Sequence, residues 1–268
     1  MTMPEASVDV LMITYNHEAY IAQAIESVLG QRTSFPVRLI VGDDHSTDST
    51  FEIAAAYAAR FPDRISASRG ETNIGMNPNW ARTYARCGSK YVALLEGDDY
   101  WSRVDKLQKQ VDFMESHEEC VLCFHDAVSL TPDGTTAEYI PRSIFSEKLS
   151  YTDADFVKFN LFPTCSAFFR NGIVTELPGE FYDAVSGDWL LYVLLSQRGQ
   201  VHFIPEKMGV RRVHQGGVWS GKSTAEQYLF RIRSIEAVDS LVRGKYQDIV
   251  EAEVERLLGE LANCLLRV

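Results

Sequence analysis

The sequence predicts an α/β fold with a mostly parallel central sheet, helices on both faces of that sheet, and further helices at the C-terminus. Through the first 130 residues, short apolar runs bounded by turn-forming residues alternate with longer segments whose apolar residues recur at helical spacing. This β-α-β-α rhythm is typical of parallel strands joined by helical crossovers. After residue 222, two long amphipathic segments follow one another with no strand pattern between them.

The expected strands are short, and most of them lie in the first half of the chain. They cover residues 8–13, 37–41, 65–67, 91–95, 121–125, 201–204 and 208–212. The expected helices cover residues 19–29, the segment from a cap at Thr47 or Asp48 to 59, and residues 77–86, 104–116, 188–196, 223–242 and 246–266. Between residues 135 and 180 the pattern is mixed, because prolines interrupt it.

The chain is acidic. Its 268 residues include 37 Asp and Glu against 26 Lys and Arg, which gives a formal net charge of −11. Nucleic-acid binding needs cations that displace counterions from phosphates, so this balance argues against a nucleic-acid partner. It is compatible with a phosphorylated ligand, because a bound metal ion supplies positive charge locally.

The five cysteines form neither a disulfide nor a zinc pattern. Cys120 and Cys123 form a CxxC, but they lie in an apolar, strand-like run, so we expect buried small hydrophobes. An odd cysteine count without a disulfide framework favours a reducing compartment. The N-terminus lacks a signal-peptide pattern and no apolar run approaches about 18 residues, so the sequence predicts a cytoplasmic protein.

Asp98 and Asp99 directly follow the apolar run at residues 91–95, in the segment Glu-Gly-Asp-Asp-Tyr-Trp. Adjacent carboxylates at the end of a buried strand are costly to desolvate unless a cation meets them. In open α/β sheets, ligands bind outside the carboxyl ends of the strands. The pair therefore indicates a divalent metal that holds a phosphorylated ligand, or else a turn, because Gly-Asp-Asp is also good turn chemistry.

Polar residues also follow the other expected strands. Thr14, Tyr15 and Asn16 end the first, and an aromatic ring there suits stacking on a nucleotide base, although a plain strand-to-helix loop explains the segment too. Asp44 follows the second strand, and its carboxylate suits the imide hydrogen of uracil or thymine. Asn73 lies in an Asn- and Gly-rich loop, where it suits either a turn or a contact to ribose or phosphate.

These motifs resemble, in order and approximate spacing, those of family 2 glycosyltransferases of the GT-A type. The resemblance covers residues 7–130 well and extends more loosely to about 220. It implies a Rossmann-like GT-A fold. It also implies a base-binding pocket lined by Thr14, Tyr15, Asn16 and Asp44. Asp98 would face the ribose or the sugar, and Asp99 would hold Mg or Mn against the diphosphate.

The resemblance extends to two later elements. Asp188, in Ser-Gly-Asp-Trp at the start of an expected helix, resembles the general base of inverting members of the family. The alternative is a helix cap, because Asp is favoured at helix N-termini. In the segment Arg-Arg-Val-His, the resemblance implies that His214 would contact the metal or the diphosphate, and that Arg211 or Arg212 would offset phosphate charge. The alternative for His214 is a solvated loop residue.

The implied activity is an inverting, non-processive transfer of the bacterial type. A sugar would move from a UDP- or dTDP-linked donor to a glycan or lipid-linked saccharide, as in polysaccharide biosynthesis. Two other functions fit parts of the sequence: a nucleotidyltransferase acting on sugar phosphates, and a non-catalytic nucleotide-sugar-binding module. The first would need a glycine-rich phosphate loop near the first strand, and the segment from Thr14 to Glu18 lacks one.

We expect three segments. Residues 1–130 would form the half that binds the nucleotide-sugar, residues 131–222 the acceptor-binding and catalytic half, and residues 223–268 a helical extension. The apolar faces of the two C-terminal helices fit packing on the core, homodimer formation, or peripheral contact with the inner face of a membrane.

Overall fold

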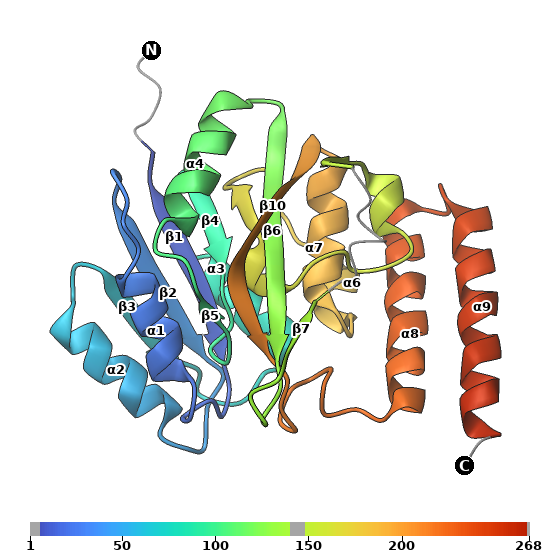
Figure 1. The fold of residues 1–268 in the computed structure, drawn as a ribbon, viewed down its shortest axis with the longest axis horizontal. Helices are drawn as coiled ribbons and strands as arrows, with labels where there is room; N and C mark the ends of the chain where they lie inside the picture. Colours follow the sequence, from blue (N-terminus) through green and yellow to red (C-terminus); the bar gives the residue numbers. More distant parts are fainter. Residues whose placement is uncertain (1–5, 140–147, 267–268) are drawn as a thin grey trace.

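The computed structural model describes residues 6–139 and 148–266. Within these residues, ten strands form one sheet with helices on both sides, and two long helices lie at one edge of the molecule (Figure 1). The α/β class and the C-terminal helices expected from the sequence are confirmed. No described helix is long and apolar enough to cross a membrane.

The observed strands agree well with the expected ones in the first half of the chain. They are β1 (Val8–Thr14), β2 (Val37–Asp43), β3 (Ile65–Arg69), β4 (Tyr91–Leu94), β5 (Tyr100–Trp101), β6 (Cys120–Leu130), β7 (Thr136–Glu138), β8 (Ser150–Tyr151), β9 (Phe168–Arg170) and β10 (Gln200–Arg212). The helices are α1 (Ile21–Leu29), α2 (Thr50–Arg60), α3 (Met76–Tyr84), α4 (Lys106–Ser116), α6 (Gly179–Asp183), α7 (Gly187–Ser196), α8 (Thr224–Val242) and α9 (Gln247–Leu265).

The main strand order is β3-β2-β1-β4-β9-β6-β10-β5. The ladders from β3 to β4 are parallel, as is that between β6 and β10. The sequence did not predict β9, which runs antiparallel between β4 and β6, with Phe169 opposite Val92 on one side and Leu122 on the other. Strands from the expected first and second segments therefore belong to one sheet.

The two short strands expected at 201–204 and 208–212 are wrong as separate elements, because β10 is continuous. Its register with β6 shifts between Ile204 and Lys207, and again between Lys207 and Gly209. Pro205 lies at the shift between Ile204 and Lys207, where a residue without a backbone N–H is tolerated. The apolar pattern that predicted two separate strands is interrupted at the residues where β10 is irregular.

Side chains on β1 alternate between two cores. Val8, Val10 and Met12 pack with α1, α2 and α4 on one face, whereas Leu11 packs with α3, α6 and α7 on the other. Helix α8 packs beside α7 and α9 packs beside α8 (Figure 1). Ile235 and Leu257 are fully buried in the second core, so both C-terminal helices pack on the body of the chain.

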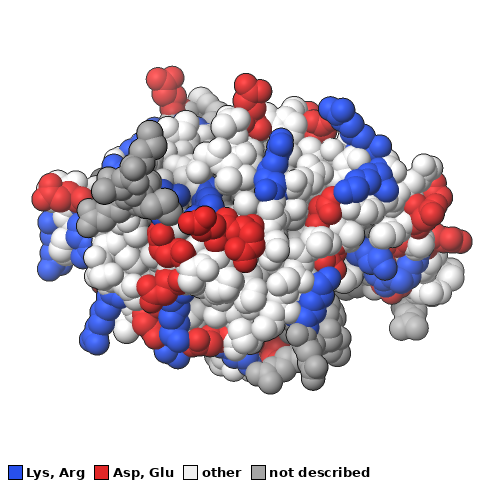
Figure 2. All heavy atoms as spheres, turned by 90° about the horizontal axis from the view of Figure 1, so that it is seen from above, with Lys and Arg blue, Asp and Glu red and all other residues white. Residues whose placement is uncertain are grey.

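The burial of Cys120 and Cys123 agrees with the sequence-based expectation. Figure 2 shows one face of the molecule, where acidic side chains gather in a cluster and basic side chains are scattered around it. Cys120 and Cys123 are buried and free, as small hydrophobes in β6.

Candidate active site

The loops after β1, β2 and β4 meet at the carboxyl edge of the parallel strands. The backbone N–H of Asp44 donates to the carbonyl of Thr14 at 2.9 Å, and that of Gly97 donates to the carbonyl of Ile13 at 3.0 Å. A Cβ atom at Gly97 would lie 2.5 Å from Thr14 Oγ1 and 3.0 Å from His17 Nδ1. Glycine thus lets the aspartate loop approach the end of β1.

A cavity of about 1010 Å³ opens at this edge and extends to α7 and the C-terminal helices. Most of the site residues expected from the sequence line it. They are Thr14, Tyr15, Asp44, Asn73, Asp98, Asp99, Asp188 and Arg212. The two others, Asn16 and His214, lie next to it rather than in its lining. The structure therefore brings the sequence-predicted motifs to one place.

Three carboxylates form the acidic end of the cavity: Glu96, Asp98 and Asp99. Their oxygens come within 4.8 Å of one another. Burial and the neighbouring charge of Asp98 raise the pKa of Asp99 well above its usual range. Burial and the same neighbour also raise that of Glu96. Three hard oxygen ligands this close together suit a divalent cation, because the cation would offset the repulsion between the carboxylate charges.

Two histidines flank Asp98. His214 Nε2 lies 2.9 Å from Asp98 Oδ2, and His17 Nε2 lies 3.8 Å from the same oxygen. Burial alone would raise the pKa of Asp98, but the His214 hydrogen bond and the two imidazoles hold it below its usual value. His17, His214 and Asp98 form a second group of candidate metal ligands. The sequence reasoning assigned no role to His17 or Glu96.

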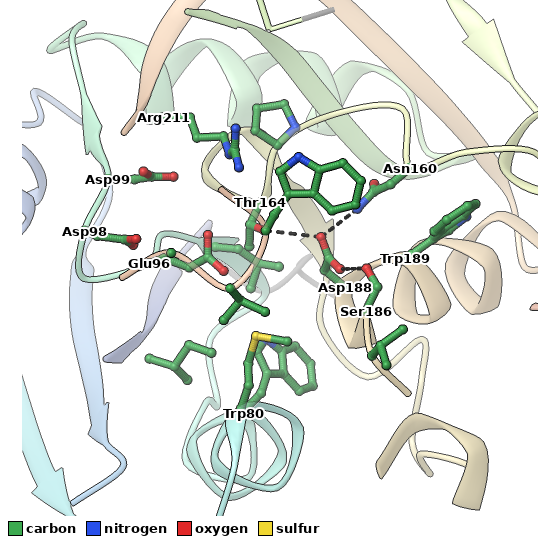
Figure 3. A pocket seen from close by; sticks show the side chains of 18 of the residues that line it. Trp80, Glu96, Asp98, Asp99, Asn160, Thr164, Ser186, Asp188, Trp189 and Arg211 are labelled. Carbon is green, nitrogen blue, oxygen red and sulfur yellow. Dashed lines mark hydrogen bonds between the residues drawn. The ribbon is translucent and has the colours of Figure 1, made fainter. Parts of the chain in front are cut away.

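Arg212 is engaged with the aspartate loop. Its backbone N–H donates to Asp99 Oδ1 at 2.8 Å, and its guanidinium donates to the Asp98 carbonyl and to Gln23. The guanidinium also lies over the Tyr100 ring, 4.6 Å from its centroid. Arg211, one residue earlier, points into the cavity above the carboxylates (Figure 3). Of the two arginines, Arg211 is therefore the one better placed to meet a ligand.

Asp44 organises the expected base pocket. Its buried carboxylate accepts hydrogen bonds from the backbone N–H groups of Ile74 and Gly75 at 3.0 and 2.9 Å. Asn73 Oδ1 accepts from the same Gly75 N–H at 3.2 Å. The carboxylate thereby ties the 73–75 loop to the end of β2, and both side chains still border the cavity.

The two residues after Thr14 have different surroundings. Tyr15 is 42% exposed at the cavity mouth, where its ring is free to stack. Asn16 adopts a positive φ of 56°, and its side-chain oxygen accepts from the Thr47 N–H at 2.8 Å. The Asn16 side chain thus links two loops instead of lining the cavity.

Asp188 faces the acidic end from the other side of the cavity (Figure 3). Its Oδ2 accepts from Asn160 Nδ2 at 2.7 Å and Thr164 Oγ1 at 3.3 Å, and its Oδ1 accepts from Ser186 Oγ at 2.7 Å. Ser186 rather than Asp188 is the N-cap residue, and its side chain makes no capping hydrogen bond. Asp188 lies in the first turn of α7, where a carboxylate also suits the helix dipole.

Sequence reasoning missed Asn160 and Thr164. Both lie in the proline-interrupted segment, where no local pattern pointed to them. Asn160 Oδ1 is buried with no hydrogen-bond partner within the described part of the chain. The hydrogen bond to Asp188 thus orients the amide of Asn160.

The comparisons with known proteins agree on one family. The model of Glycosyl transferase family 2 matches residues 9–174. An uncharacterised protein of Mycobacterium tuberculosis is 33% identical over 265 residues, which cover 96% of this chain and 73% of the relative.

Two solved structures share the fold. TarS of Staphylococcus aureus, residues 1–349 in complex with UDP-GlcNAc, has a TM-score of 0.67 and 20% identity over 96% of this chain and 72% of that one. The mannosyltransferase PcManGT from Pyrobaculum calidifontis, in complex with GDP-Man and Mn²⁺, has a TM-score of 0.68 and 15% identity over 97% and 74%. By its family match and its GT-A fold, this chain belongs to glycosyl transferase family 2 and is a glycosyltransferase.

Proposed function

We propose that the protein is an inverting transferase that moves a sugar from a nucleoside-diphosphate donor, UDP- or dTDP-linked, to a hydroxyl of a glycan or lipid-linked saccharide. One observation carries the proposal. The carboxylates of Asp98 and Asp99 and that of Asp188 face the same cavity from opposite sides (Figure 3). This arrangement leaves the space between them for the donor sugar.

The acidic end suits the diphosphate and a divalent metal, Mg or Mn. Asp99 and His214 are the proposed metal ligands, with Asp98 towards the ribose or sugar. The metal, when bound, would neutralise charge on the departing diphosphate. Arg211, which faces the cavity, and Arg212, which fixes the aspartate loop, would support the same end. The Mn²⁺ held by the neighbour PcManGT is consistent with this assignment.

The base of the nucleotide would lie at the mouth formed by the ends of β1 and β2. Tyr15 would stack on the base, and Asp44 would accept its imide hydrogen. Each carboxylate oxygen of Asp44 already accepts one backbone N–H, and each has a second lone pair for the ligand. Thr14 and Asn73 complete this part of the proposed pocket.

Asp188 is the proposed general base. It would take the proton of the acceptor hydroxyl while that oxygen forms a bond to the anomeric carbon. The bond from that carbon to the diphosphate oxygen would break on the opposite side, so an α-linked donor would give a β-linked product. Asn160 and Ser186 hold one carboxylate oxygen each, which orients Asp188 for this step.

Isothermal titration with UDP, with and without Mn²⁺, tests the donor end. We expect metal-dependent binding that Asp99→Ala abolishes. Metal-independent binding of equal strength would remove the role of Asp99. A titration with dTDP on the same sample then compares the two bases, since Asp44 suits the imide of either.

A non-catalytic binding module is the remaining alternative. It predicts that Asp188 can be replaced with no functional loss, and an assay of sugar transfer by Asp188→Asn tests this. A nucleotidyltransferase is no longer favoured, given the family to which the chain belongs.

A further inference from the structure

The first turn of α3 lies between the two ends of the catalytic cavity. At the donor end, the N–H of Gly75, the residue before α3, donates to the Asp44 carboxylate at 2.9 Å. Two residues later, Asn77 lines the same cavity, and its side chain is buried. Figure 3 shows Trp80 of α3 below the space that separates the acidic end from Asp188. Asn77 is therefore placed to connect the two ends.

The Asn77 amide holds the end of α6. Its Nδ2 donates to the carbonyl oxygens of Phe181 and Ala184, at 2.9 and 2.6 Å. Both carbonyls lie at the C-terminal end of this short helix, where backbone oxygens lack a helical partner. One turn along α3, the Trp80 ring packs against that of Phe181, with 5.5 Å between the two centroids. The start of α3 thus fixes the end of α6.

The backbone of Gly187 packs against the same amide. A Cβ atom at Gly187 would lie 2.7 Å from Asn77 Cγ, closer than side chains approach in proteins. The amide donates to one end of the segment 184–187 and contacts the other end, so Asn77 holds this segment at both ends. The segment leads directly into Asp188, and it supplies Ser186, whose Oγ donates to Asp188 Oδ1 at 2.7 Å.

We propose that Asn77 is a positioning residue, which sets the direction of Asp188 from the donor side of the cavity. The inference rests on the proposed function, because it takes Asp188 to be the general base. Asn160 holds the carboxylate by a direct hydrogen bond, whereas Asn77 holds the backbone from which the carboxylate projects. The same turn of α3 is tied to Asp44, so one element keeps the base pocket and Asp188 in register.

Asn77→Ala tests this role, with Asn171→Ala as the matched control. Asn171 Nδ2 also bridges two carbonyls, those of Cys87 and Ser89, at 3.5 and 2.9 Å, but Asn171 does not line the cavity. We expect both variants to lower the melting temperature. Only Asn77→Ala should also lower kcat, by about tenfold, while UDP affinity in the presence of Mn²⁺ stays within about twofold. Equal kcat values for the two variants would overturn the inference.

A double-mutant cycle shows whether Asn77 acts through Asp188. Turnover is followed as release of UDP from UDP-glucose and UDP-N-acetylglucosamine, with water in place of the acceptor, since the same base would remove a proton from water. In the Asp188→Asn background, Asn77→Ala should change the remaining rate by less than about twofold, because the group that it positions is already lost. A merely structural role predicts the same loss in both backgrounds, and that result would also overturn the inference.

Gly187→Ala approaches the contact from the other side and does not depend on the folding of Asn77→Ala. The added methyl group meets the Asn77 amide, whereas Gly179→Ala, at the first residue of α6, meets no atom within 4 Å. We expect Gly187→Ala to lower kcat about tenfold and Gly179→Ala to leave it within about twofold. Alanine favours a helix at both positions, so equal rates for the two variants would contradict the contact.

A crystal structure of Asn77→Ala gives a readout that needs no sugar donor. We expect the segment 184–187 to shift and the hydrogen bond between Asp188 and Asn160 to be lost, and an unmoved Asp188 carboxylate would overturn the inference. The two proposals fail separately. Near-normal turnover by Asp188→Asn contradicts the general base of the proposed function, whereas a large loss in Asp188→Asn with none in Asn77→Ala contradicts the positioning role alone.

Discussion

Asp188 Oδ2 accepts a hydrogen bond from Asn160 Nδ2 at 2.7 Å, across the wall of the catalytic cavity. The two residues come from different elements, since Asp188 opens α7 and Asn160 lies 28 residues earlier in an irregular segment. The contact fixes the direction of a carboxylate in the first turn of α7 that is not the N-cap of the helix. The proposed role of Asp188 as general base requires its carboxylate to be oriented in this way.

Replacing Asp188 with Asn should separate binding from chemistry. The amide keeps the size of the side chain but cannot accept the hydroxyl proton, so kcat should fall by about 100-fold or more while UDP affinity stays within about twofold. Sugar transfer measured by chromatography of the product gives kcat. Asp183→Asn, an exposed neighbour in α6, is the control and should behave as the unchanged protein. Near-normal transfer by Asp188→Asn would exclude it as the base.

Asn160→Ala removes one of the hydrogen bonds that orient Asp188. We expect kcat to fall about tenfold and the acceptor KM to rise, with UDP affinity unchanged. A purely structural role would instead lower the melting temperature and reduce all parameters together. Differential scanning fluorimetry alongside the kinetics distinguishes the two.

The two histidines at Asp98 should not be equivalent. His214 lies 2.9 Å from Asp98 and His17 lies 3.8 Å away, so His214→Ala should weaken Mn²⁺ binding about tenfold or more, and His17→Ala by less. Electron paramagnetic resonance of free Mn²⁺ in the presence of UDP measures both affinities. His117→Ala, which loses ring stacking on Phe113 and His202 and local hydrogen bonds to Ser116 and Phe113, is the control. A larger effect from His17 would reverse the assignment.

Gly97→Ala should disturb the site through one methyl group. The added Cβ would lie 2.5 Å from Thr14 Oγ1, so the aspartate loop must shift, with a loss of about 1–3 kcal/mol in unfolding free energy and weaker Mn²⁺ binding. Gly259→Ala in α9 meets no atom within 4 Å and should stabilise the protein by up to about 1 kcal/mol. Chemical denaturation compares them. Unchanged Mn²⁺ affinity in Gly97→Ala would contradict the close approach.

Lys106 is buried beneath Trp101, with Nζ 3.7 Å from the ring centroid, and its Nζ has no hydrogen-bond partner within the described residues. Burial lowers the pKa of Lys106 to about 7. Below pH 7 both the folded and the unfolded chain carry the proton, so the cost of the buried charge is fully present. Between pH 7 and about 10.4 the unfolded chain holds more protons, so this cost shrinks as the pH rises.

Lys106→Met should therefore raise the unfolding free energy by roughly 1–3 kcal/mol at pH 6 and by less at pH 9. Urea denaturation at the two pH values, with the difference between variant and unchanged protein as readout, isolates this residue. Lys109→Met, which loses a surface ion pair with Glu206, should give a small difference at both. A stabilisation by Lys106→Met that is larger at pH 9 than at pH 6 would contradict the lowered pKa of Lys106.

The strand ends were predictable because their signal is local. A short apolar run followed by Thr14, Asp44 or Asp98 is visible in the sequence, and parallel strands bring such ends to one edge. The strand β9 was not predictable in this way. Its three residues, Phe168–Arg170, are a strand because β4 and β6 lie on either side of them, and pairing rather than propensity decides such a case.

Side-chain roles that depend on distant partners were also out of reach. His17 matters because it lies beside Asp98, and Asn160 because it meets Asp188. Arg211 or Arg212 was expected at the phosphates, and the sequence could not show that the guanidinium of Arg212 donates to the Asp98 carbonyl and to Gln23, 189 residues away in sequence. Sequence patterns identify the chemistry at strand ends, whereas the neighbours that tune it are set by packing.

The placement of β9 also bears on how ligands enter and leave. Phe169 is paired on both sides, to Val92 and to Leu122, so β9 bridges the strands that carry the aspartate loop and those that carry Arg211. Opening the molecule as two hinged lobes would break both ladders at once. Turnover should therefore proceed on a rigid frame, with exchange of donor and product governed by local motion of the loop at 214–222.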